Sequence, residues 1–290
     1  MTTPASDVQS PSPLIFVMGA SGQVGGEIAL QLTAAGVPFR IGVRDPSSVQ
    51  FPETVEVVRF DASDPQTFTA LDGVQRMFLL WPPGTEVRRD LLPMLAHARA
   101  SGVRQVVFLS ILGAEKIGVL PHRHVERWLE TSGMDWVFLR ASYFMQNLSS
   151  VHRDDVRLRH EVFLPAGGGK TSFVDVRDVA AVGVQALLEG DRQVAYDLTG
   201  GAALDYAEVA STLSVTLGKP VTYTNPSPWH FVQVNRARGI KTSFALFMLA
   251  EYTVARLGLA ARVTGDVRRV LGREPITLRK FAEDHREKWL

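Results

Sequence analysis

The sequence predicts an α/β fold in which a doubly wound parallel sheet carries a smaller α-rich C-terminal lobe. Three observations lead to this prediction. The run Leu14–Met18 is apolar throughout, as expected for a strand that is buried on both faces. A glycine-rich turn follows and leads into an amphipathic helix. Strand-like and helical segments then alternate as far as residue 150, which is typical of a parallel sheet with crossover helices.

The first helix is predicted over residues 23–35, because Val24, Ile28 and Leu32 recur at helical spacing and Gly36 supplies a stop. Further strands and helices complete the alternation. The expected strands are Phe39–Val43, Val55–Phe60, Arg76–Leu80, Gln105–Leu109 and Trp136–Leu139, and the expected helices are Glu86–Ala100 and His122–Thr131. The sheet domain is therefore predicted to span residues 14–150.

Residues 151–290 are predicted to form the smaller lobe, partly interleaved with the sheet. The pattern there is looser, with a loop at Pro165–Gly169 and a strand at Val194–Leu198. Helices are expected at Val179–Leu188, Asp205–Leu217 and Thr277–Lys288. Aromatic and Met side chains between Trp229 and Tyr252 favour core packing, with an apolar substrate pocket as the alternative.

Composition narrows the class of partner. The 290 residues are 46% hydrophobic, with 31 basic and 30 acidic residues, so no global charge attracts nucleic acid or an anionic membrane. The absence of cysteine excludes disulfides, thiolate metal sites and thiol catalysis. We therefore expect a small-molecule substrate, no nucleic acid partner and no membrane partner, and the sequence leaves the oligomeric state open.

Two segments could be mistaken for targeting or membrane elements. Residues 1–13 are polar and rich in Ser, Thr and Pro, so they are interpreted as a flexible tail of a cytoplasmic protein rather than a secretory signal. The apolar stretch Phe244–Val263 is interrupted by Glu251, Arg256 and Arg262, which favours a lid or core helix over a membrane helix.

The turn Gly19-Ala20-Ser21-Gly22-Gln23-Val24-Gly25 stands between the buried strand and the helix, where such a fingerprint indicates a Rossmann-type dinucleotide site. Gly19 permits the tight turn, Gly22 allows close approach of a pyrophosphate, and Gly25 allows close packing of helix and strand. The helix N-terminus offers N–H groups and a positive dipole end to the phosphates. The cofactor-binding residues predicted here are Gly19, Ser21, Gly22, Gln23, Val24 and Gly25.

Arg44 follows the second strand, at the position where an NAD enzyme would have a ribose-binding acid. Its guanidinium can pair with a 2′-phosphate in a bidentate manner, which favours NADP(H). Asp45 comes next and could accept a hydrogen bond from a ribose hydroxyl instead, which would favour NAD.

From Leu14 to about Ala210 the chain resembles the NmrA-like family of atypical short-chain dehydrogenase/reductases. The resemblance rests on the G-x-x-G-x-x-G turn and on the following segments: Val43–Pro46, Phe60–Pro65, Phe78–Pro83, Ala100–Ser110, Leu139–Asn147, Phe173–Ala180 and Tyr196–Gly200. It implies a Rossmann domain that binds NADP(H), with a small substrate lobe. It further implies that Asp61 and Ala62 lie against the adenine, that Leu80, Trp81 and Pro82 line the cofactor, and that Ser110 lies near the nicotinamide. Tyr143 and Asn147 would belong to a pocket-forming segment, with a core aromatic and a turn as the alternative.

The proton donor of ordinary short-chain dehydrogenases, Tyr-x-x-x-Lys, is absent from this chain. The residues four positions after its tyrosines are Asn147, Gly200, Ala210, Ser227 and Arg256. Where many NmrA-like proteins have a lysine, this chain has His122, three residues before Val125-Glu126. His122 could bind the nicotinamide ribose or donate a proton, so His122 and Tyr143 are the candidate catalytic residues. An exposed structural role at the helix start is the alternative for His122 and His124, and their i, i+2 spacing predicts no metal site.

These observations favour an NADPH-dependent reductase that passes hydride to an electron-poor acceptor such as a quinone, enone or imine. Such acceptors need little acid catalysis, so a site without Tyr-x-x-x-Lys suffices. The alternative is a regulatory protein that senses NADP(H) without turnover. A third possibility, an isomerase or cyclase on the same fold, would be indicated by a blocked glycine turn.

Overall fold

The computed structural model describes residues 13–290, so the expected N-terminal tail, except Pro13, lies outside the described residues. This part of the chain forms two compact units. The first unit comprises residues 13–108, 121–137 and 184–194, and the second comprises residues 109–120, 138–183 and 195–290. The domain boundary expected at residue 150 falls inside the second unit, because three strands of the sheet each continue from one unit into the other.

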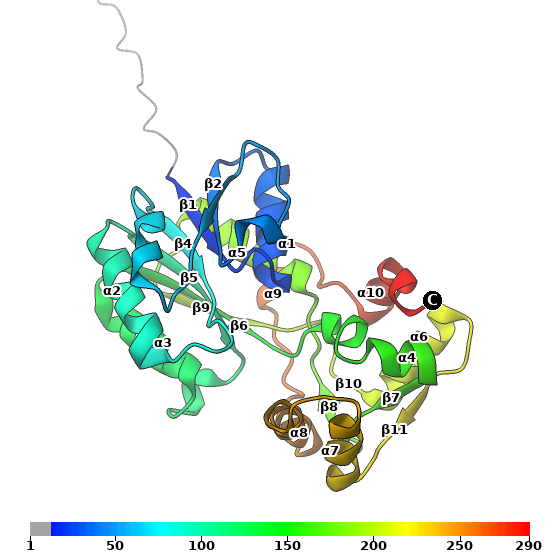
Figure 1. Ribbon diagram of the computed structural model, residues 1–290. Helices are drawn as coiled ribbons and strands as arrows, with labels where there is room; N and C mark the ends of the chain where they lie inside the picture. The colour runs from blue at the N-terminus through cyan, green and yellow to red at the C-terminus, as the bar shows by residue number, and fades with distance from the viewer. Residues whose placement is uncertain (1–12) are drawn as a thin grey trace, which may run out of the picture. The chain divides into compact units, whose positions relative to one another are not determined.

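The main sheet has seven strands in the order β3-β2-β1-β4-β5-β6-β9 (Figure 1). The pairs β1–β2, β1–β4, β2–β3 and β4–β5 are parallel, which agrees with the predicted doubly wound sheet. The strands are β1 (Ile15–Met18), β2 (Phe39–Val43), β3 (Glu56–Arg59), β4 (Arg76–Leu79), β5 (Gln105–Ile111), β6 (Asp135–Ala141) and β9 (Val194–Leu198). The strand order reverses between β1 and β4, the position at which such sheets bind ligands.

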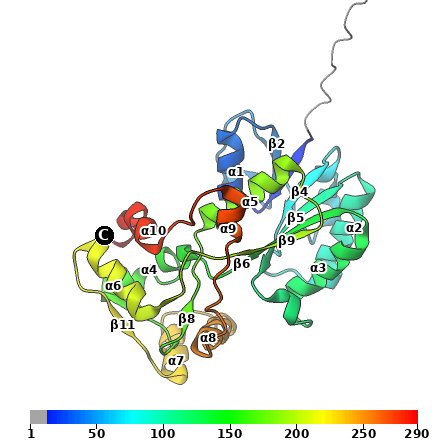
Figure 2. The same cartoon turned by 180° about the vertical axis from the view of Figure 1, so that it is seen from behind.

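Helices cover both faces of the sheet in the first unit. The helix α1 (Gln23–Ala34) lies on one face, and α2 (Leu92–Ala100) and α3 (Pro121–Ser132) lie on the other, as Figure 2 shows from behind. The expected helix at residues 86–100 begins as a π-helical turn at Val87–Leu91. Pro93 follows this turn and has no N–H to donate, which explains the altered hydrogen bonding.

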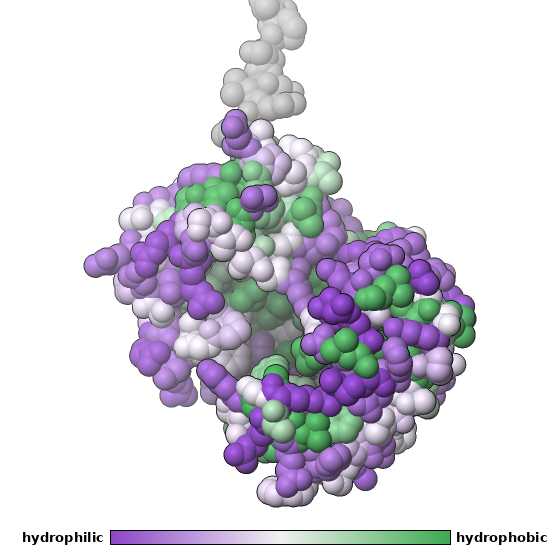
Figure 3. All heavy atoms as spheres, turned by 45° about the vertical axis from the view of Figure 1, so that its right-hand side comes forward, coloured by the Kyte–Doolittle hydropathy of each residue, from purple (hydrophilic) through white to green (hydrophobic). Residues whose placement is uncertain are grey.

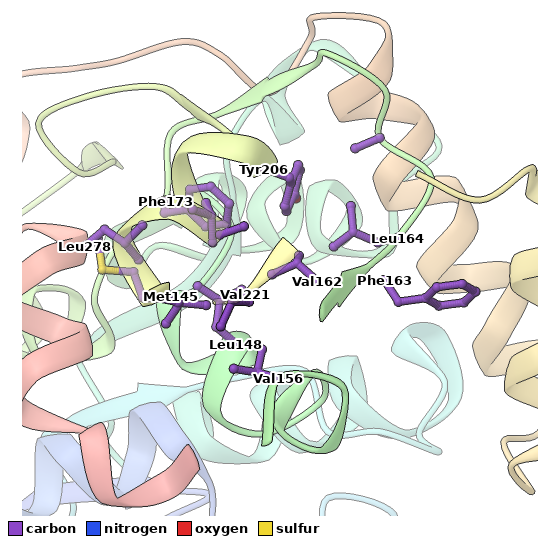
Figure 4. Close-up of a cluster of buried hydrophobic side chains, with 14 of the residues drawn as sticks. Met145, Leu148, Val156, Val162, Phe163, Leu164, Phe173, Tyr206, Val221 and Leu278 are labelled. Carbon is purple, nitrogen blue, oxygen red and sulfur yellow. The ribbon is translucent and has the colours of Figure 1, made fainter. Parts of the chain in front are cut away.

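The second unit is mostly helical, as expected for the C-terminal lobe. Its helices are α4 (Arg153–Arg159), α6 (Tyr206–Leu217), α7 (Pro228–Ala237), α8 (Thr242–Arg256), α9 (Asp266–Leu271) and α10 (Leu278–Asp284), and α5 (Val176–Glu189) begins in it. Two small sheets pair β8 (Lys170–Thr171) with β10 (Leu204–Asp205), and β7 (Glu161–Phe163) with β11 (Thr222–Thr224). Figure 4 shows the core of this unit, where Phe173, Tyr206 and Leu278 lie among its buried side chains.

Local capping explains where two of the expected helices begin. Asp205 caps α6 in a capping box with Glu208, and the Thr277 hydroxyl accepts a hydrogen bond from the Lys280 N–H at the start of α10. The expected lid or core helix is α8, which ends at Arg256, two residues before Gly258 with φ +76°. Among residues 13–290, no helix combines the length and the apolar character needed to cross a bilayer.

The aromatic stretch between Trp229 and Tyr252 divides between core and surface. Phe231, Met248 and Tyr252 are buried, so the core-packing interpretation is confirmed for them. Trp229 on α7 and two phenylalanines of α8, Phe244 and Phe247, are exposed. The face of the molecule in Figure 3 likewise intersperses apolar residues, drawn in green, with hydrophilic ones in purple.

Candidate functional site

The glycine turn between β1 and α1 has the backbone geometry that the sequence predicts. Gly19 has φ +73°, a conformation that side chains disfavour, and its carbonyl accepts a hydrogen bond of 2.9 Å from the Gly22 N–H. A Cβ on Gly25 would lie 2.4 Å from the Gly19 carbonyl oxygen, so only glycine allows this contact between helix and turn. The turn is therefore tight and closely packed against α1.

The N-terminus of α1 is open towards a ligand. Gly22 precedes the helix in an extended conformation and has no side chain with which to cap this end. Ser21, Gly22 and Gln23 are exposed, whereas Val24 and Gly25 are buried at the first turn of the helix. A helix N-terminus with exposed backbone and a positive dipole end is suited to bind phosphate groups.

A pocket of about 370 Å³ lies at this turn, within the size range of small-molecule sites. Its walls come from the glycine turn, from the carboxyl ends of β2 and β3, and from the loop after β4. All of its lining residues belong to the first unit. They are Met18, Gly19, Ser21, Gly22, Gly42, Val43, Arg44, Phe60, Asp61, Ala62, Ser63, Leu80, Pro82, Pro83, Gly84 and Thr85.

Two charged residues stand in this pocket. Arg44 is exposed at the end of β2, and Asp61 lies beside it on the loop after β3. The Asp61 carboxylate accepts hydrogen bonds from the Ser63 N–H at 2.9 Å and the Ser63 hydroxyl at 2.7 Å. These bonds, helped by the charge of Arg44, hold the pKa of Asp61 below its ordinary value. The Asp61 carboxylate is therefore ionised at neutral pH and fixed in orientation.

Asp45, the alternative ribose ligand, has a different role. Its carboxylate caps the turn that follows, where it accepts hydrogen bonds from the Ser47 hydroxyl at 2.7 Å and the Ser47 N–H at 3.0 Å. These bonds also lower the pKa of Asp45. Asp45 is not among the residues that line the pocket, whereas Arg44 is.

Hydrogen bonds between its own residues stabilise the loop after β4. The Trp81 indole N–H donates to the Thr85 carbonyl at 3.0 Å, and the Thr85 hydroxyl donates to the Pro82 carbonyl at 2.8 Å. The Trp81 ring packs edge-on against the His122 ring, with centroids 5.3 Å apart. Trp81 and His122 therefore stand together beside the pocket loop, although neither lines the pocket.

His122 is the second residue of α3 and is partly buried between Trp81 and Phe108, whose ring centroid lies 6.1 Å from that of His122. Burial lowers the pKa of His122 to about 4, while the charge of Glu126 acts in the opposite direction. The ring is therefore neutral at neutral pH and can donate one N–H hydrogen bond. A neutral imidazole is better suited to bind a ribose hydroxyl than to act as a proton-donating acid.

The remaining expected site residues belong to the second unit. Ser110 is buried in β5, and Tyr143 and Asn147 follow β6. Burial raises the pKa of the Tyr143 hydroxyl, although hydrogen bonds from Tyr252 and Asn147 oppose the shift. Tyr143 is therefore a phenol, not a phenolate, at neutral pH.

The structure thus groups eight of the expected residues around one pocket. They are Gly19, Ser21, Gly22, Arg44, Asp61, Ala62, Leu80 and Pro82. Gln23, Val24 and Gly25 form the helix turn behind the glycine loop. Sequence reasoning missed Gly42 and Ser63. A Cβ on Gly42 would lie 2.2 Å from the Phe16 ring, and a glycine within a strand is a signal of such close approach.

Comparisons with known proteins show the family to which this chain belongs. The model of the NmrA-like family matches residues 11–276. An NAD(P)H azoreductase from Xenophilus azovorans is 33% identical over 283 residues, which cover 94% of this chain and 98% of the azoreductase.

A (4-alkanoyl-5-oxo-2,5-dihydrofuran-3-yl)methyl phosphate reductase from Streptomyces griseus is also 33% identical, over 94% of this chain and 98% of that protein. The solved structure of an NADPH-dependent quinone oxidoreductase from Escherichia coli has a TM-score of 0.83 at 24% identity. The similarity covers 93% of this chain and 99% of that chain. At this level of identity, it shows that the two proteins share a fold.

Proposed function

Because the chain belongs to the NmrA-like family, we propose that it is an NADPH-dependent reductase that transfers hydride to an electron-poor small molecule such as a quinone, enone or imine. The observation that carries the proposal is the pocket at the glycine turn, which combines an open helix N-terminus with Arg44. The two relatives at 33% identity are named as reductases, which supports this reaction class.

The residues of the pocket fit a dinucleotide. The turn from Gly19 to Gly22 lets a pyrophosphate approach the backbone, and a Cβ on Gly25 would push the helix away from it. Ala62 and Leu80 provide apolar walls for an adenine ring, and Asp61 provides a fixed acceptor. NADPH, when bound, supplies the hydride.

The choice of NADPH over NADH rests on Arg44 and Asp45. Arg44 lines the pocket, where its guanidinium can bind a 2′-phosphate through two parallel hydrogen bonds. The Asp45 carboxylate is held by Ser47, so it is not placed as a ribose ligand. We therefore assign the phosphate-bearing cofactor.

Around the reacting atoms, the chain is proposed to contribute orientation and exclusion of water rather than strong acid catalysis. Trp81 holds the loop after β4 through its bond to Thr85, and His122 packs against its ring. Neutral His122 is proposed to donate a hydrogen bond to the nicotinamide ribose, the part that we assign to it in place of the family's lysine. Ser110 and Asn147 are proposed to complete the cofactor site.

The decisive experiment measures NADPH and NADH oxidation against a panel of neutral quinones, enones and cyclic imines, with binding titrations of both cofactors alongside. Oxidation of NADPH with one acceptor class is the expected result. Tight binding of NADPH without oxidation across the panel would replace the proposal with an NADP(H)-sensing regulatory role. Absence of binding of either cofactor would overturn it altogether.

A further inference from the structure

Helix α8 of the second unit is apolar on two opposite sides. Its inner side packs into the core of this unit through Ala245, Met248, Tyr252 and Ala255, which are buried. Its outer side is apolar as well, although a helix at the surface of a monomeric protein has a polar outer side. The exposed apolar side chains of α8 are Phe244, Leu246, Phe247 and Val254.

Exposed apolar side chains gather in this part of the second unit. Single exposed hydrophobic residues are common on protein surfaces, whereas a contiguous group marks an interaction surface. Eight large hydrophobic side chains are exposed between residues 229 and 263. They are Trp229, Phe244, Leu246, Phe247, Val254, Leu257, Leu259 and Val263.

The spacing of the outer residues of α8 is that of a helix–helix contact. Ser243, Phe247, Ala250, Val254 and Leu257 follow one another at alternating intervals of four and three residues, and all five are exposed. This alternation keeps residues in line along one side of a helix, as in the seam where two helices pack together. We call these five residues the outer seam. With 15 residues, α8 is about 22 Å long, so the seam runs along its whole length.

The outer seam is complementary to itself in an antiparallel pair. In such a pair, alternate seam residues of one helix pack beside those of the other. The register that places Phe247 beside Ala250 of a second copy also places Val254 beside Ser243 of that copy. Each large side chain then lies beside a small one, which is the condition for close packing without a cavity.

The charges on α8 argue against other occupants of this face. From Thr242 to Ala255 the one charged residue is Glu251, which stands beside the outer seam and not in it. An anionic lipid surface is bound through Lys and Arg side chains that flank an apolar face, and α8 has none before its last residue, Arg256. An apolar surface of the same shape, which a second copy supplies, fits this face.

We propose that this protein forms a two-fold symmetric dimer in which α8 packs antiparallel against α8 of a second copy. A two-fold contact uses the same surface on both copies, so the assembly closes at two chains. A single pair of helices buries less area than a standard interface, so we expect a dissociation constant in the micromolar range. The proposal uses residues of the second unit alone and does not depend on the reductase function.

The first test is sedimentation equilibrium of the full chain across the micromolar range. The wild type is expected to have the mass of one chain at the lowest concentrations and of two chains at the highest. Phe247→Glu, which places a charge in the outer seam, is expected to raise the dissociation constant roughly hundred-fold or more. The matched control is Val215→Glu on α6, because Val215 is 64% exposed and Phe247 is 56% exposed in the same unit. This control should associate as the wild type does.

Three results would overturn the dimer and leave the reductase function untouched. One is a wild type with the mass of a single chain at every concentration. In that case, co-sedimentation with phosphatidylglycerol vesicles would assign the face to lipid. A lower unfolding temperature of Phe247→Glu than of Val215→Glu would instead assign it to another part of the same chain. The third is a wild-type dimer that persists in Phe247→Glu, since another surface would then form the contact.

The second test reports the register and needs no disruption of the contact. The chain has no cysteine, so one introduced thiol reports one position. The proposed two-fold axis passes between residues 248 and 249. The two copies of residue 250 are then about 5 Å apart along the helix axes, and those of residue 257 about 25 Å apart.

A short bis-maleimide is therefore expected to join two chains of Ala250→Cys and to leave Leu257→Cys as single chains. Cross-linking of both variants would indicate a parallel pair, and cross-linking of neither would show that the two helices do not meet. Either result would overturn the proposed antiparallel dimer.

Discussion

The Trp81 indole stands edge-on to the His122 imidazole, with centroids 5.3 Å apart and ring planes at 84°. This contact joins the loop after β4 to the first turn of α3, and it keeps His122 in surroundings that disfavour its cation. The position at which the family resemblance implies a lysine is thus occupied here by a ring that is neutral at neutral pH.

A pH-dependent stability follows from the lowered pKa of His122. The folded pKa of about 4 lies below the ordinary value of 6.5, so the unfolded chain binds the extra proton first. Stability is therefore full above pH 6.5 and decreases as the pH falls towards 4. We expect a loss of about 2 kcal/mol over this window, reduced from the full shift because the ring is partly accessible to solvent. Urea unfolding of the wild type and of His122→Gln across this pH range measures the loss of stability.

His124→Gln is the control for this measurement, because His124 is the neighbouring imidazole on the same helix. The control should keep the wild-type pH dependence, and His122→Gln should flatten it. An unchanged slope in His122→Gln would place the proton uptake elsewhere.

The contact between Gly25 and the Gly19 carbonyl predicts a second outcome. A Cβ at residue 25 would meet backbone atoms, which cannot move aside as a side-chain tip can. Gly25→Ala is expected to lower the free energy of unfolding by about 1–3 kcal/mol and to abolish NADPH binding. Thermal unfolding and cofactor titration measure the two effects. Gly201→Ala, where an added Cβ meets nothing within 4 Å, should do neither.

Replacement of Arg44 tests the cofactor assignment. Arg44→Ala should weaken NADPH binding about ten- to hundred-fold, the contribution of charge-assisted hydrogen bonds to a phosphate, and should leave NADH binding almost unchanged. The comparison variant is Arg127→Ala, which removes an exposed arginine from α3. If Arg44→Ala weakens both cofactors equally, the 2′-phosphate is not its ligand.

Asp178 predicts a stability effect that is independent of the site. Its carboxylate is fully buried, accepts the Ile276 N–H at 2.7 Å and pairs with Arg273 at 2.7 Å. Asp178→Ala leaves the Ile276 N–H without its acceptor and is expected to cost about 1–3 kcal/mol in chemical unfolding. Asp178→Asn keeps an acceptor oxygen, and burial raises the pKa of the native carboxyl, so this variant should lose much less. A similar loss in both variants would show that the charge matters more than the hydrogen bond.

The sequence predicted most accurately those elements that depend on interactions between residues close together in the chain. The turn from Gly19 to Gly25 and helix α1 agree with expectation to within a residue, because glycine placement and helical periodicity act within a few positions. Strand β8 was not predicted, since it has two residues and exists through its pairing with β10. Helix α4 is short and polar, with no periodicity strong enough to detect.

The residues of the candidate site likewise differ in whether the sequence alone could identify them. Arg44 and the glycines could be named from the sequence because the chemistry of their motif lies in adjacent positions. Tyr143 and Tyr252, whose hydroxyl oxygens lie 3.1 Å apart, are more than a hundred positions apart in the sequence. Tyr143 was singled out, but its partners emerge only from folding. Long-range hydrogen bonds between single polar residues leave no local pattern to find.

The interleaving of the two units constrains how the protein is made on the ribosome. The first unit draws its last segment from residues 184–194, and β9 at Val194–Leu198 is the edge strand of the main sheet. A nascent chain that has passed the glycine turn, and even β6, still lacks this strand. The nucleotide pocket is therefore encoded early, yet its supporting sheet is completed only after two-thirds of the chain has been synthesised. Until then, the edge of β6 that later pairs with β9 is open, and open strand edges favour pairing with other chains.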